Sequence, residues 1–321
     1  MEFKMKLAIG FITYGEDTAK YLPYFLPSLF KALEKISDYK IFCWDNSESD
    51  RSNIEFIASN YPEIKIIKSD KNIGFASAYN RMIDEAKKSG AEYFLVINPD
   101  TILEPKAIKE LIEIMDKDKS LGSASPKVLK WDFERNKKTN IIDTCGIGLK
   151  TGLRFFDFGQ RQEDEGQYNK ADILGPSGVA GLYRMSALEK ARENGQYFDG
   201  RMFMYKEDCD LAYRLNLAGF KAKLAPEAMI YHDRTISSAG KGFWAFFRGR
   251  KGKNRQAKQW SFLNQHIIFM KYWNRQNILN KLIVLARVKG MMVYALLFEQ
   301  YLLKEYGKLW KMRNKIKKYG L

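Results

Sequence analysis

The segment from Glu92 to Thr101, which reads Glu-Tyr-Phe-Leu-Val-Ile-Asn-Pro-Asp-Thr, constrains the fold of this chain more than any other. Its apolar core, residues 93–97, is typical of a buried strand. The strand runs into a tight Asn-Pro turn that carries the carboxylate of Asp100. In open α/β sheets ligands bind outside the carboxyl ends of the strands, and a divalent cation that grips a diphosphate needs oxygen ligands there. A ligand site and a simple helix cap fit Asp100 equally well from this segment alone.

Short apolar runs rich in branched and aromatic side chains alternate with helical segments over the first 120 residues. The predicted strands are residues 7–12, 40–44, 64–67 and 93–97, and the predicted helices are residues 21–36, 52–60, 76–89 and 105–116. Such alternation gives parallel βαβ units and an α/β fold. Residues 131–172 are polar and contain several glycines, so we expect them to form a long irregular excursion.

Charge is concentrated near the C-terminus. The chain of 321 residues has a net charge of +16, and residues 241–321 hold 19 Lys and Arg against 2 Asp and Glu. The basic excess therefore belongs to this last quarter, and residues 1–240 are nearly neutral. The three cysteines, Cys43, Cys145 and Cys209, are isolated, so neither a disulfide framework nor a zinc site is expected. The N-terminal residues enter a strand without a signal-peptide pattern, which predicts a cytoplasmic protein.

The basic tail is predicted to be helical and amphipathic. Charges such as Lys281, Arg287 and Lys289 interrupt its apolar runs well short of a membrane span. One helical face carries the lysines, and the opposite side carries Leu302, Tyr306, Leu309, Trp310 and Ile316; the lysines are Lys304, Lys308, Lys311, Lys315 and Lys318. This pattern favours an anionic membrane surface as partner. Packing on its own domain, or on a second subunit in a homo-oligomer, is the alternative.

Five motifs follow one another in order along the chain. They are Phe-Ile-Thr-Tyr-Gly at 11–15, Trp-Asp-Asn-Ser at 44–47, Asn-Ile-Gly-Phe-Ala-Ser-Ala-Tyr-Asn at 72–80, Asn-Pro-Asp-Thr at 98–101 and Tyr-Lys-Glu-Asp-Cys-Asp-Leu-Ala-Tyr-Arg at 205–214. Together they resemble a family 2 glycosyltransferase of the GT-A fold, closest to rhamnosyltransferase-like members, over roughly the first 235 residues. The family's usual Asp-x-Asp reads Asn98-Pro-Asp100 here, a departure that is common among rhamnosyltransferase-like sequences.

Polar and small residues at the predicted strand ends indicate a nucleotide site. Asp45 can accept the imide N–H of uracil or thymine, or it can cap a local turn. The helix that begins at residues 76–80 presents an N-terminus that favours phosphate. Arg184 can contact the diphosphate, although a turn into a helix from Ser186 explains its segment equally well. With the family resemblance, the predicted nucleotide-sugar site comprises Thr13, Tyr14, Gly15, Asp45, Asn72, Gly74, Asn80, Asn98, Asp100, Ser177, Gly178 and Arg184.

The acidic run Glu207-Asp208-Cys209-Asp210 is the candidate catalytic segment. An acidic first turn suits a helix dipole, but three carboxylates in four residues exceed what capping requires. The resemblance implies that Asp208 is the general base that removes a proton from the acceptor hydroxyl, and that Glu207 and Asp210 orient the base or the acceptor sugar.

His232 lies at the end of an apolar run and is one of two histidines in the chain. A lone histidine is more often structural than a ligand. The resemblance implies that His232 joins Asp100 as a ligand of Mn²⁺ or Mg²⁺, and an imidazole nitrogen suits Mn²⁺ better.

These observations predict a GT-A domain with a Rossmann-like mixed sheet over residues 1–240, followed by a basic helical extension over residues 241–321. The expected reaction is an inverting, metal-dependent transfer of one sugar to a glycan or lipid-linked acceptor, for cell-surface polysaccharide synthesis at the inner face of the cell membrane. Rhamnose from dTDP-rhamnose is the expected donor, and a UDP-linked galactofuranose, glucose or N-acetyl sugar is the alternative. A non-catalytic nucleic-acid- or glycan-binding protein is the other class, but the tail lacks a recognised nucleic-acid motif, so nucleic acid is not an expected partner.

Overall fold

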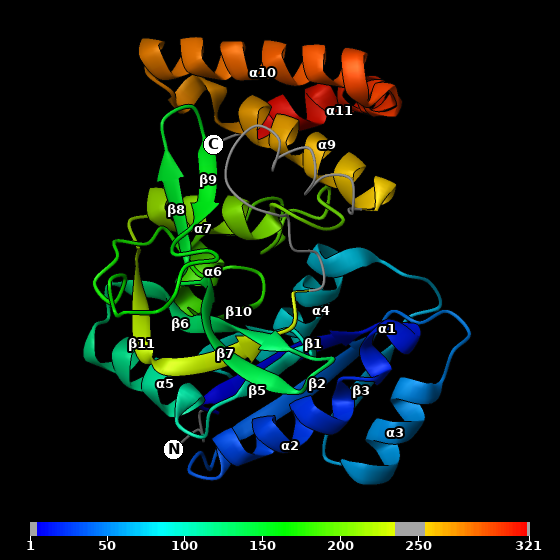
Figure 1. The fold of residues 1–321 in the computed structure, drawn as a ribbon, viewed down its shortest axis with the longest axis vertical. Coiled ribbons are helices and arrows are strands. Elements are labelled where there is room, and N and C mark those ends of the chain that lie inside the picture. Colours follow the sequence, from blue (N-terminus) through cyan, green and yellow to red (C-terminus); the bar gives the residue numbers. More distant parts are fainter. Residues whose placement is uncertain (1–4, 235–253, 320–321) are drawn as a thin grey trace.

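The computed structural model describes residues 5–234 and 254–319, and its main body is built around one mixed sheet (Figure 1). Nine strands within these ranges form the sheet, in the order β3-β2-β1-β4-β10-β6-β11-β5 with β7 paired to β6. The strands are β1 (Leu7–Thr13), β2 (Tyr39–Asp45), β3 (Lys65–Lys68), β4 (Tyr93–Ile97), β5 (Thr101–Leu103), β6 (Leu121–Asp132), β7 (Lys137–Thr144), β10 (Ala180–Arg184) and β11 (Lys221–His232). A separate hairpin joins β8 (Ile147–Lys150) to β9 (Arg154–Asp157).

Helices cover both faces of the sheet because successive strand residues point to opposite sides. Leu7, Ile9 and Leu95 face a core shared with α2 and α5, whereas Ala8 and Phe94 face a core shared with α4, α6 and α7. The helices of the main body are α1 (Gly15–Ala19), α2 (Leu22–Leu33), α3 (Ser52–Asn60), α4 (Gly74–Lys88), α5 (Ala107–Lys117), α6 (Met185–Lys190) and α7 (Glu207–Leu217).

The first four predicted strands and helices are confirmed to within a few residues at their ends. Strands β1 to β4 are parallel, as the alternation predicts. The prediction of an irregular excursion over residues 131–172 is wrong, because this stretch contains β7 and the β8–β9 hairpin. Strand β7 lies at an edge of the sheet, paired with β6 alone, and its first residues are exposed. Polar residues therefore suit β7, and its sequence lacks the apolar run from which a strand is predicted.

The C-terminal helices stack at one end of the molecule, with α10 outermost (Figure 1). They are α9 (Arg255–Tyr272), α10 (Ile278–Phe298) and α11 (Lys304–Tyr319), separated by the short 3-10 turns η1 (Trp273–Arg275) and η2 (Gln300–Leu303). Apolar residues of α9 share a core with Met202 before α7, Cys209 in α7 and the β8–β9 hairpin. The hydrophobic core therefore continues across the predicted boundary near residue 240.

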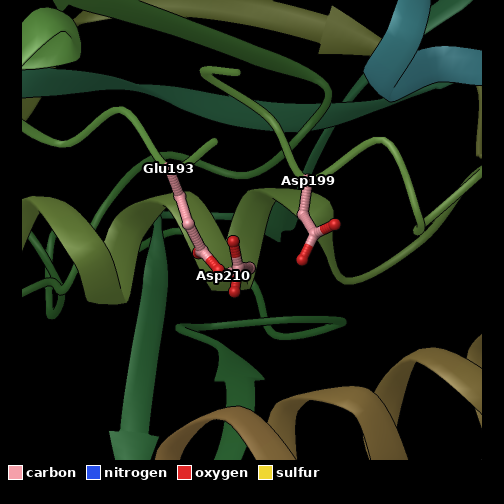
Figure 2. A group of neighbouring side chains, drawn as sticks. All are labelled: Glu193, Asp199 and Asp210. Atoms are coloured by element: carbon pink, nitrogen blue, oxygen red, sulfur yellow. The ribbon is translucent and has the colours of Figure 1, made fainter. Parts of the chain in front are cut away.

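A buried ionic cluster joins α9 to the start of α7. Figure 2 shows Glu193 and Asp199 reaching from loops toward Asp210 on α7. The Nζ atom of Lys271 on α9 lies 2.6 Å from Glu193 Oε2, 3.0 Å from Asp199 Oδ2 and 2.6 Å from Asp210 Oδ1. The three carboxylates have the composition of a cation site, but the lysine ammonium is the cation between them. Burial lowers the pKa of Lys271, yet the carboxylates outweigh burial and raise it.

Two arginines complete the neutralisation of this cluster. Arg214 Nε donates to Asp210 Oδ2 at 2.9 Å, and Arg201 Nη2 donates to Asp199 Oδ2 at 2.6 Å. The cluster thus balances three carboxylates against three cations without a metal ion, and it fixes the loop before α7 relative to α9.

Replacing Lys271 with Met should destabilise the fold strongly. The change keeps most of the side-chain volume but leaves three buried carboxylates with one cation fewer, and breaking a buried pair in this way costs about 3–5 kcal/mol. Urea unfolding would measure the loss. Lys289→Met, at an exposed position on α10, is the matched control and should change the unfolding free energy by less than about 0.5 kcal/mol. Equal stability of the two variants would show that the cluster contributes nothing beyond packing.

Candidate active site

The register of β11 against β5 brings His232 beside Asp100. His232 is paired with Thr101 in the antiparallel ladder, and the backbone N–H of Asp233 donates to the carbonyl of Asp100 at 3.0 Å. As a result His232 Nε2 lies 3.2 Å from Asp100 Oδ2, although 132 residues separate the two in sequence. The ligand pair implied by the resemblance is therefore close in space.

Asp143 on β7 orients the His232 ring from its other side. Asp143 Oδ2 lies 2.8 Å from His232 Nδ1, and Asp143 Oδ1 lies 3.0 Å from Arg234 Nε. Burial lowers the pKa of His232, but the charges of and hydrogen bonds to Asp100 and Asp143 outweigh it and raise the pKa to about 10. A carboxylate behind a histidine is the arrangement that holds a metal-binding imidazole in orientation.

The donor atoms at Asp100 and His232 fit a divalent metal ion. Asp100 Oδ1 is buried and has no hydrogen-bond partner among the described residues. A carboxylate oxygen with an imidazole nitrogen beside it suits Mn²⁺, whereas Mg²⁺ prefers oxygen ligands. The backbone oxygen of Asn98 accepts a hydrogen bond from Thr101 Oγ1 at 2.6 Å, which holds the turn that presents Asp100.

Asp208 sits in the first turn of α7 with both carboxylate oxygens hydrogen-bonded. The backbone N–H of Gly178 donates to its Oδ2 at 2.9 Å, and the N–H of Cys209 donates to its Oδ1 at 2.7 Å. These two contacts fix the orientation of the Asp208 carboxyl group next to the Gly-rich segment 175–184.

Glu207 has the opposite environment from its neighbour. It is buried, and its Oε2 has no hydrogen-bond partner within the described part of the chain. Burial, followed by the charge of Asp208, raises the pKa of Glu207 well above its usual range. The two adjacent acids therefore have different surroundings, since Asp208 accepts from two backbone N–H groups and Glu207 has a buried oxygen without a partner in the described ranges.

The loop before α7 is held in a strained conformation. Tyr205 and Lys206 both have φ of 72°, a region that non-glycine residues rarely occupy. The side chain of Asn264 on α9 donates to the carbonyl oxygens of Met204 at 2.9 Å and Tyr205 at 2.7 Å. Helix α9 therefore holds the backbone that places Glu207 and Asp208.

Asp45, the last residue of β2, forms the other end of the site. Its Oδ1 accepts from the hydroxyl groups of Thr13 and Ser47, each at 2.7 Å. Its Oδ2 is buried and has no hydrogen-bond partner in the described ranges, which suits a donor such as the imide N–H of a pyrimidine. Next to it lies a cavity of about 330 Å³ lined by Tyr14, Gly15, Glu16, Asp17, Ser47, Glu48, Ser49 and Asp50.

Ser177, another residue of the predicted nucleotide-sugar site, also has a buried polar atom without a hydrogen-bond partner in the described ranges. Its hydroxyl is buried and lacks a hydrogen-bond partner among the described residues, one position before the Gly178 amide that contacts Asp208. Four side-chain oxygens of predicted site residues therefore share this property, on Asp45, Asp100, Ser177 and Glu207.

The predicted contact between Arg184 and the diphosphate is wrong. In the antiparallel pairing of β10 with β4, Arg184 lies opposite Tyr93, the first residue of β4, whereas Asp100 follows the last. The guanidinium is buried, donating to Leu121 O at 3.0 Å and to Tyr93 Oη at 3.1 Å. Strand β10 is antiparallel to β4. Arg184, at the C-terminal end of β10, therefore lies at the opposite end of these strands from Asp100.

Asn80 and the start of α4 also have structural roles rather than the predicted ligand contacts. Asn80 Oδ1 accepts from the N–H groups of Tyr197 and Phe198, and its Nδ2 donates to Phe198 O. Asn72 caps the turn by accepting from the Gly74 N–H at 2.9 Å, and the Phe75 N–H donates to Phe203 O at 2.8 Å. The first two amides of α4 are thus used within the protein.

Gly74 is required by a backbone contact instead of a ligand. Its φ is +79°, and a Cβ atom at this position would lie 2.5 Å from Phe203 O. The loop before α7 therefore packs directly on the α4 turn.

Asp210 does not orient the base or the acceptor, contrary to prediction. Its carboxylate is fully buried and accepts from Lys271 and Arg214, and from the hydroxyl of Tyr272 at 2.7 Å. It lies two positions after Asp208 on α7, so the helix turns it away from the Asp208 side and into the contact with α9.

Three charged residues at the site, Asp143, Asp157 and Arg234, were not predicted from the sequence. Arg234 Nη2 lies 3.6 Å from Asp157 Oδ2. Burial raises the pKa of Asp157, Arg234 opposes that effect, and the charges of Asp143 and Asp208 add to it. Asp157 therefore joins the His232 group through Arg234. The sequence signal for Asp143 and Asp157 is an acid near the end of a strand, but their strands, β7 and β9, lie in the stretch predicted to be irregular.

Known proteins of similar sequence are glycosyltransferases and related synthases. The model of the family described as "Glycosyl transferase family 2" matches residues 9–192. An N-acetylglucosaminyl-diphospho-decaprenol L-rhamnosyltransferase of Mycobacterium tuberculosis is 25% identical over 247 residues, which cover 72% of this chain and 77% of the relative. A poly-beta-1,6-N-acetyl-D-glucosamine synthase of Staphylococcus epidermidis is 23% identical over 260 residues, or 80% of this chain and 52% of the relative.

A solved structure shares the fold. The crystal structure of GalNAc-T7 with UDP, GalNAc and Mn²⁺ superposes with a TM-score of 0.54 at 12% sequence identity. The match covers 83% of this chain and 51% of that one, so the chain spans about half of that structure. The superposition supports the GT-A fold predicted from the sequence.

Proposed function

Because the chain belongs to glycosyl transferase family 2 and is rhamnosyltransferase-like, we propose that it transfers one rhamnose from dTDP-rhamnose to a lipid-linked glycan acceptor. The single observation that carries the proposal is the set of four buried oxygens without partners, on Asp45, Asp100, Ser177 and Glu207. Buried polar groups are nearly always hydrogen-bonded, so partners for these atoms are expected from a ligand. Their spread from β2 to α7 suits an extended nucleoside diphosphate sugar.

Different residues would contact the base and the diphosphate of the donor. Asp45 Oδ2 would accept the imide N–H of thymine, with Tyr14, 46% exposed, beside the base. Asp100 and His232 would hold the metal ion, which when bound neutralises charge on the departing diphosphate. Asn98 remains a proposed contact, and Thr13 supports Asp45 through its hydroxyl group. The predicted contact of Gly15 is not kept, because its amide donates to Ser47 Oγ at 2.8 Å and its carbonyl accepts from Asn53 Nδ2 at 2.9 Å.

Asp208 is proposed as the general base. It would take the proton of the acceptor hydroxyl as that oxygen attacks the anomeric carbon, and the new bond forms on the face opposite the departing diphosphate, so the configuration inverts. Glu207, whose pKa is raised by burial, would stay protonated beside it. A protonated Glu207 would add no negative charge of its own beside the proposed base.

The acceptor is proposed from the chemistry of the relatives. The name of the mycobacterial relative includes a diphospho-decaprenol compound. An acceptor of that class would place this enzyme at the inner face of the cell membrane. The staphylococcal relative is named for a polymer of N-acetylglucosamine, which favours a UDP-linked N-acetyl sugar as the second candidate donor. Both donors present a pyrimidine imide to Asp45.

A donor panel tests this proposal directly. The protein would be incubated with Mn²⁺, a membrane lipid extract as acceptor source, and dTDP-rhamnose, UDP-N-acetylglucosamine, UDP-galactofuranose or UDP-glucose in turn. Mass spectrometry should find an acceptor mass increase of one deoxyhexose with dTDP-rhamnose alone. An increase with a UDP-sugar and none with dTDP-rhamnose would replace the donor assignment.

Asp208→Asn should keep nucleotide binding and lose turnover. The amide preserves the size of the side chain but cannot take a proton, so kcat should fall about 10²–10⁴-fold while calorimetry finds the same affinity for the nucleoside diphosphate. Asp172→Asn, at an exposed position, is the matched control and should behave as the unmodified protein. Near-normal kcat in Asp208→Asn would remove this residue from the base role.

Asp100→Ala and His232→Ala should each weaken Mn²⁺-dependent binding of the nucleoside diphosphate. Each change removes a proposed ligand of the ion, so calorimetry with Mn²⁺ should find a lower affinity for the nucleoside diphosphate than in the unmodified protein. This difference in affinity should disappear when the variant and the unmodified protein are both measured in EDTA. Asp143→Asn should have a smaller effect, about 10–100-fold on metal affinity, as expected for a group behind the ligand. Full activity of the unmodified protein in excess chelator would show that the metal assignment is wrong.

A further inference from the structure

Helix α10 presents a long apolar face to solvent. Of its 21 residues only Val284 and Ala295 are buried. The exposed apolar side chains run the length of the helix, and the most exposed are Ile278 at 80%, Leu297 at 68%, Leu279 at 63%, Leu282 at 59% and Phe298 at 58%. A helix of this length extends about 30 Å. A contiguous apolar surface of this size usually marks an interaction site.

The apolar side chains of the neighbouring helix α11 do not complete this face. Leu309 and Ile316 of α11 are buried in the core that α9 shares with the main body. Leu302, in the turn η2 just before α11, is buried against Phe262 of α9 and Ala295 of α10. Lys304, Lys308, Lys311 and Lys315 are exposed as predicted. Trp310 is also exposed, at 67%, with the Arg313 guanidinium 3.8 Å from its ring centroid, so it does not lie on the packed side.

The charges around the apolar face have one sign. Helix α10 contains no acidic residue. Its Lys289 is exposed and its Lys281 is half-buried, whereas Arg287 is turned to the main body and donates to the carbonyl oxygen of Gly152. The two acids in residues 241–321, Glu299 and Glu305, are buried and paired with Lys258 at 2.9 Å and Lys308 at 2.9 Å. The exposed surface at this end is therefore apolar and cationic.

This charge pattern distinguishes between two candidate partners. A two-fold symmetric contact places the same patch of both copies together, so lysines of one copy would face lysines of the other with no exposed acid to pair. An anionic lipid surface provides both an apolar phase for the leucines and negative charge for the lysines. The surface therefore fits a bilayer better than a second copy.

A basic cavity lies at the C-terminal end of the apolar face. Its volume is about 640 Å³, and it is lined by Arg255, Lys258, Leu297, Phe298, Glu299, Gln300, Tyr301 and Lys304. Two of the most exposed apolar residues of α10 thus border three cations. Lys258 is paired with Glu299, but Lys304 is exposed. Such a border between apolar and cationic side chains fits the phosphate of a lipid headgroup.

We propose that the outward face of α10 lies in the headgroup region of an anionic bilayer, with the exposed lysines of α11 contributing charge. Within the described residues no helix is long and apolar enough to cross a bilayer, so the helix would lie in the plane of the interface. The proposal deepens the proposed function, since a lipid-linked acceptor would then be met at its own surface. It depends on that function only for the identity of the acceptor.

Sedimentation with vesicles tests the proposal. The full-length protein should sediment with phosphatidylglycerol–phosphatidylcholine vesicles at low salt, and sedimentation should weaken as salt rises. Leu279→Ser, Leu282→Ser and Leu297→Ser combined should lower the affinity for these vesicles more than ten-fold. The side chains are exposed, so thermal unfolding and nucleotide binding should not change. Leu217→Ser on α7, at an exposed apolar position outside α10, is the matched control.

A charge variant separates the contributions of α11 and α10. Changing Lys304, Lys308, Lys311 and Lys315 to Glu should also lower vesicle affinity at least ten-fold. Unchanged sedimentation of the triple serine variant would overturn the proposal for α10. So would a wild-type protein that ignores anionic vesicles, or one that is a dimer by light scattering and becomes a monomer in the triple variant. Nucleotide binding by the same proteins tests the proposed function separately.

Discussion

The buried ion cluster around Lys271 is the interaction on which the site depends. It joins α9 to Asp210 on α7 and to Glu193 and Asp199 in the preceding loops. The backbone just before α7 is strained at Tyr205 and Lys206, and such strain persists only where the surrounding contacts enforce it. The same helix α9 also supplies the Asn264 contacts to this loop. Residues far along the sequence from Asp208 therefore determine its position.

The sheet sets the second half of the site. Pairing of β11 with β5 places His232 next to Asp100, and Asp143 approaches from β7. The described residues thus include two groups of acids with different neighbours. One group surrounds the ammonium of Lys271, and the other surrounds the imidazole of His232. The lysine gives the first group a structural role, and the second group is the one that we propose as the ligand site.

The parallel strands and the polar residues at their ends could be predicted from the sequence. The spacing of apolar residues and the residue preferences of turns are both local properties of the chain. The pairing of Asp100 with His232 came from the family resemblance, since no local pattern specifies contacts 132 residues apart. Arg184 and Asn80 were misassigned because position in a motif does not reveal strand direction or which amides are already bonded. The apolar face of α10 was missed because buried and exposed leucines read alike in sequence. Only packing reveals that α11 buries its apolar side and α10 does not.

We propose that the metal ion and the donor diphosphate bind at Asp100 and His232. The most direct test is a crystal structure with Mn²⁺ and dTDP, with anomalous scattering measured at the manganese edge. An anomalous peak should lie within coordination distance of an Asp100 carboxylate oxygen and His232 Nε2, next to the diphosphate. A peak among Glu193, Asp199 and Asp210 with Lys271 displaced, or dTDP bound away from Asp45 and Asp100, would contradict the account.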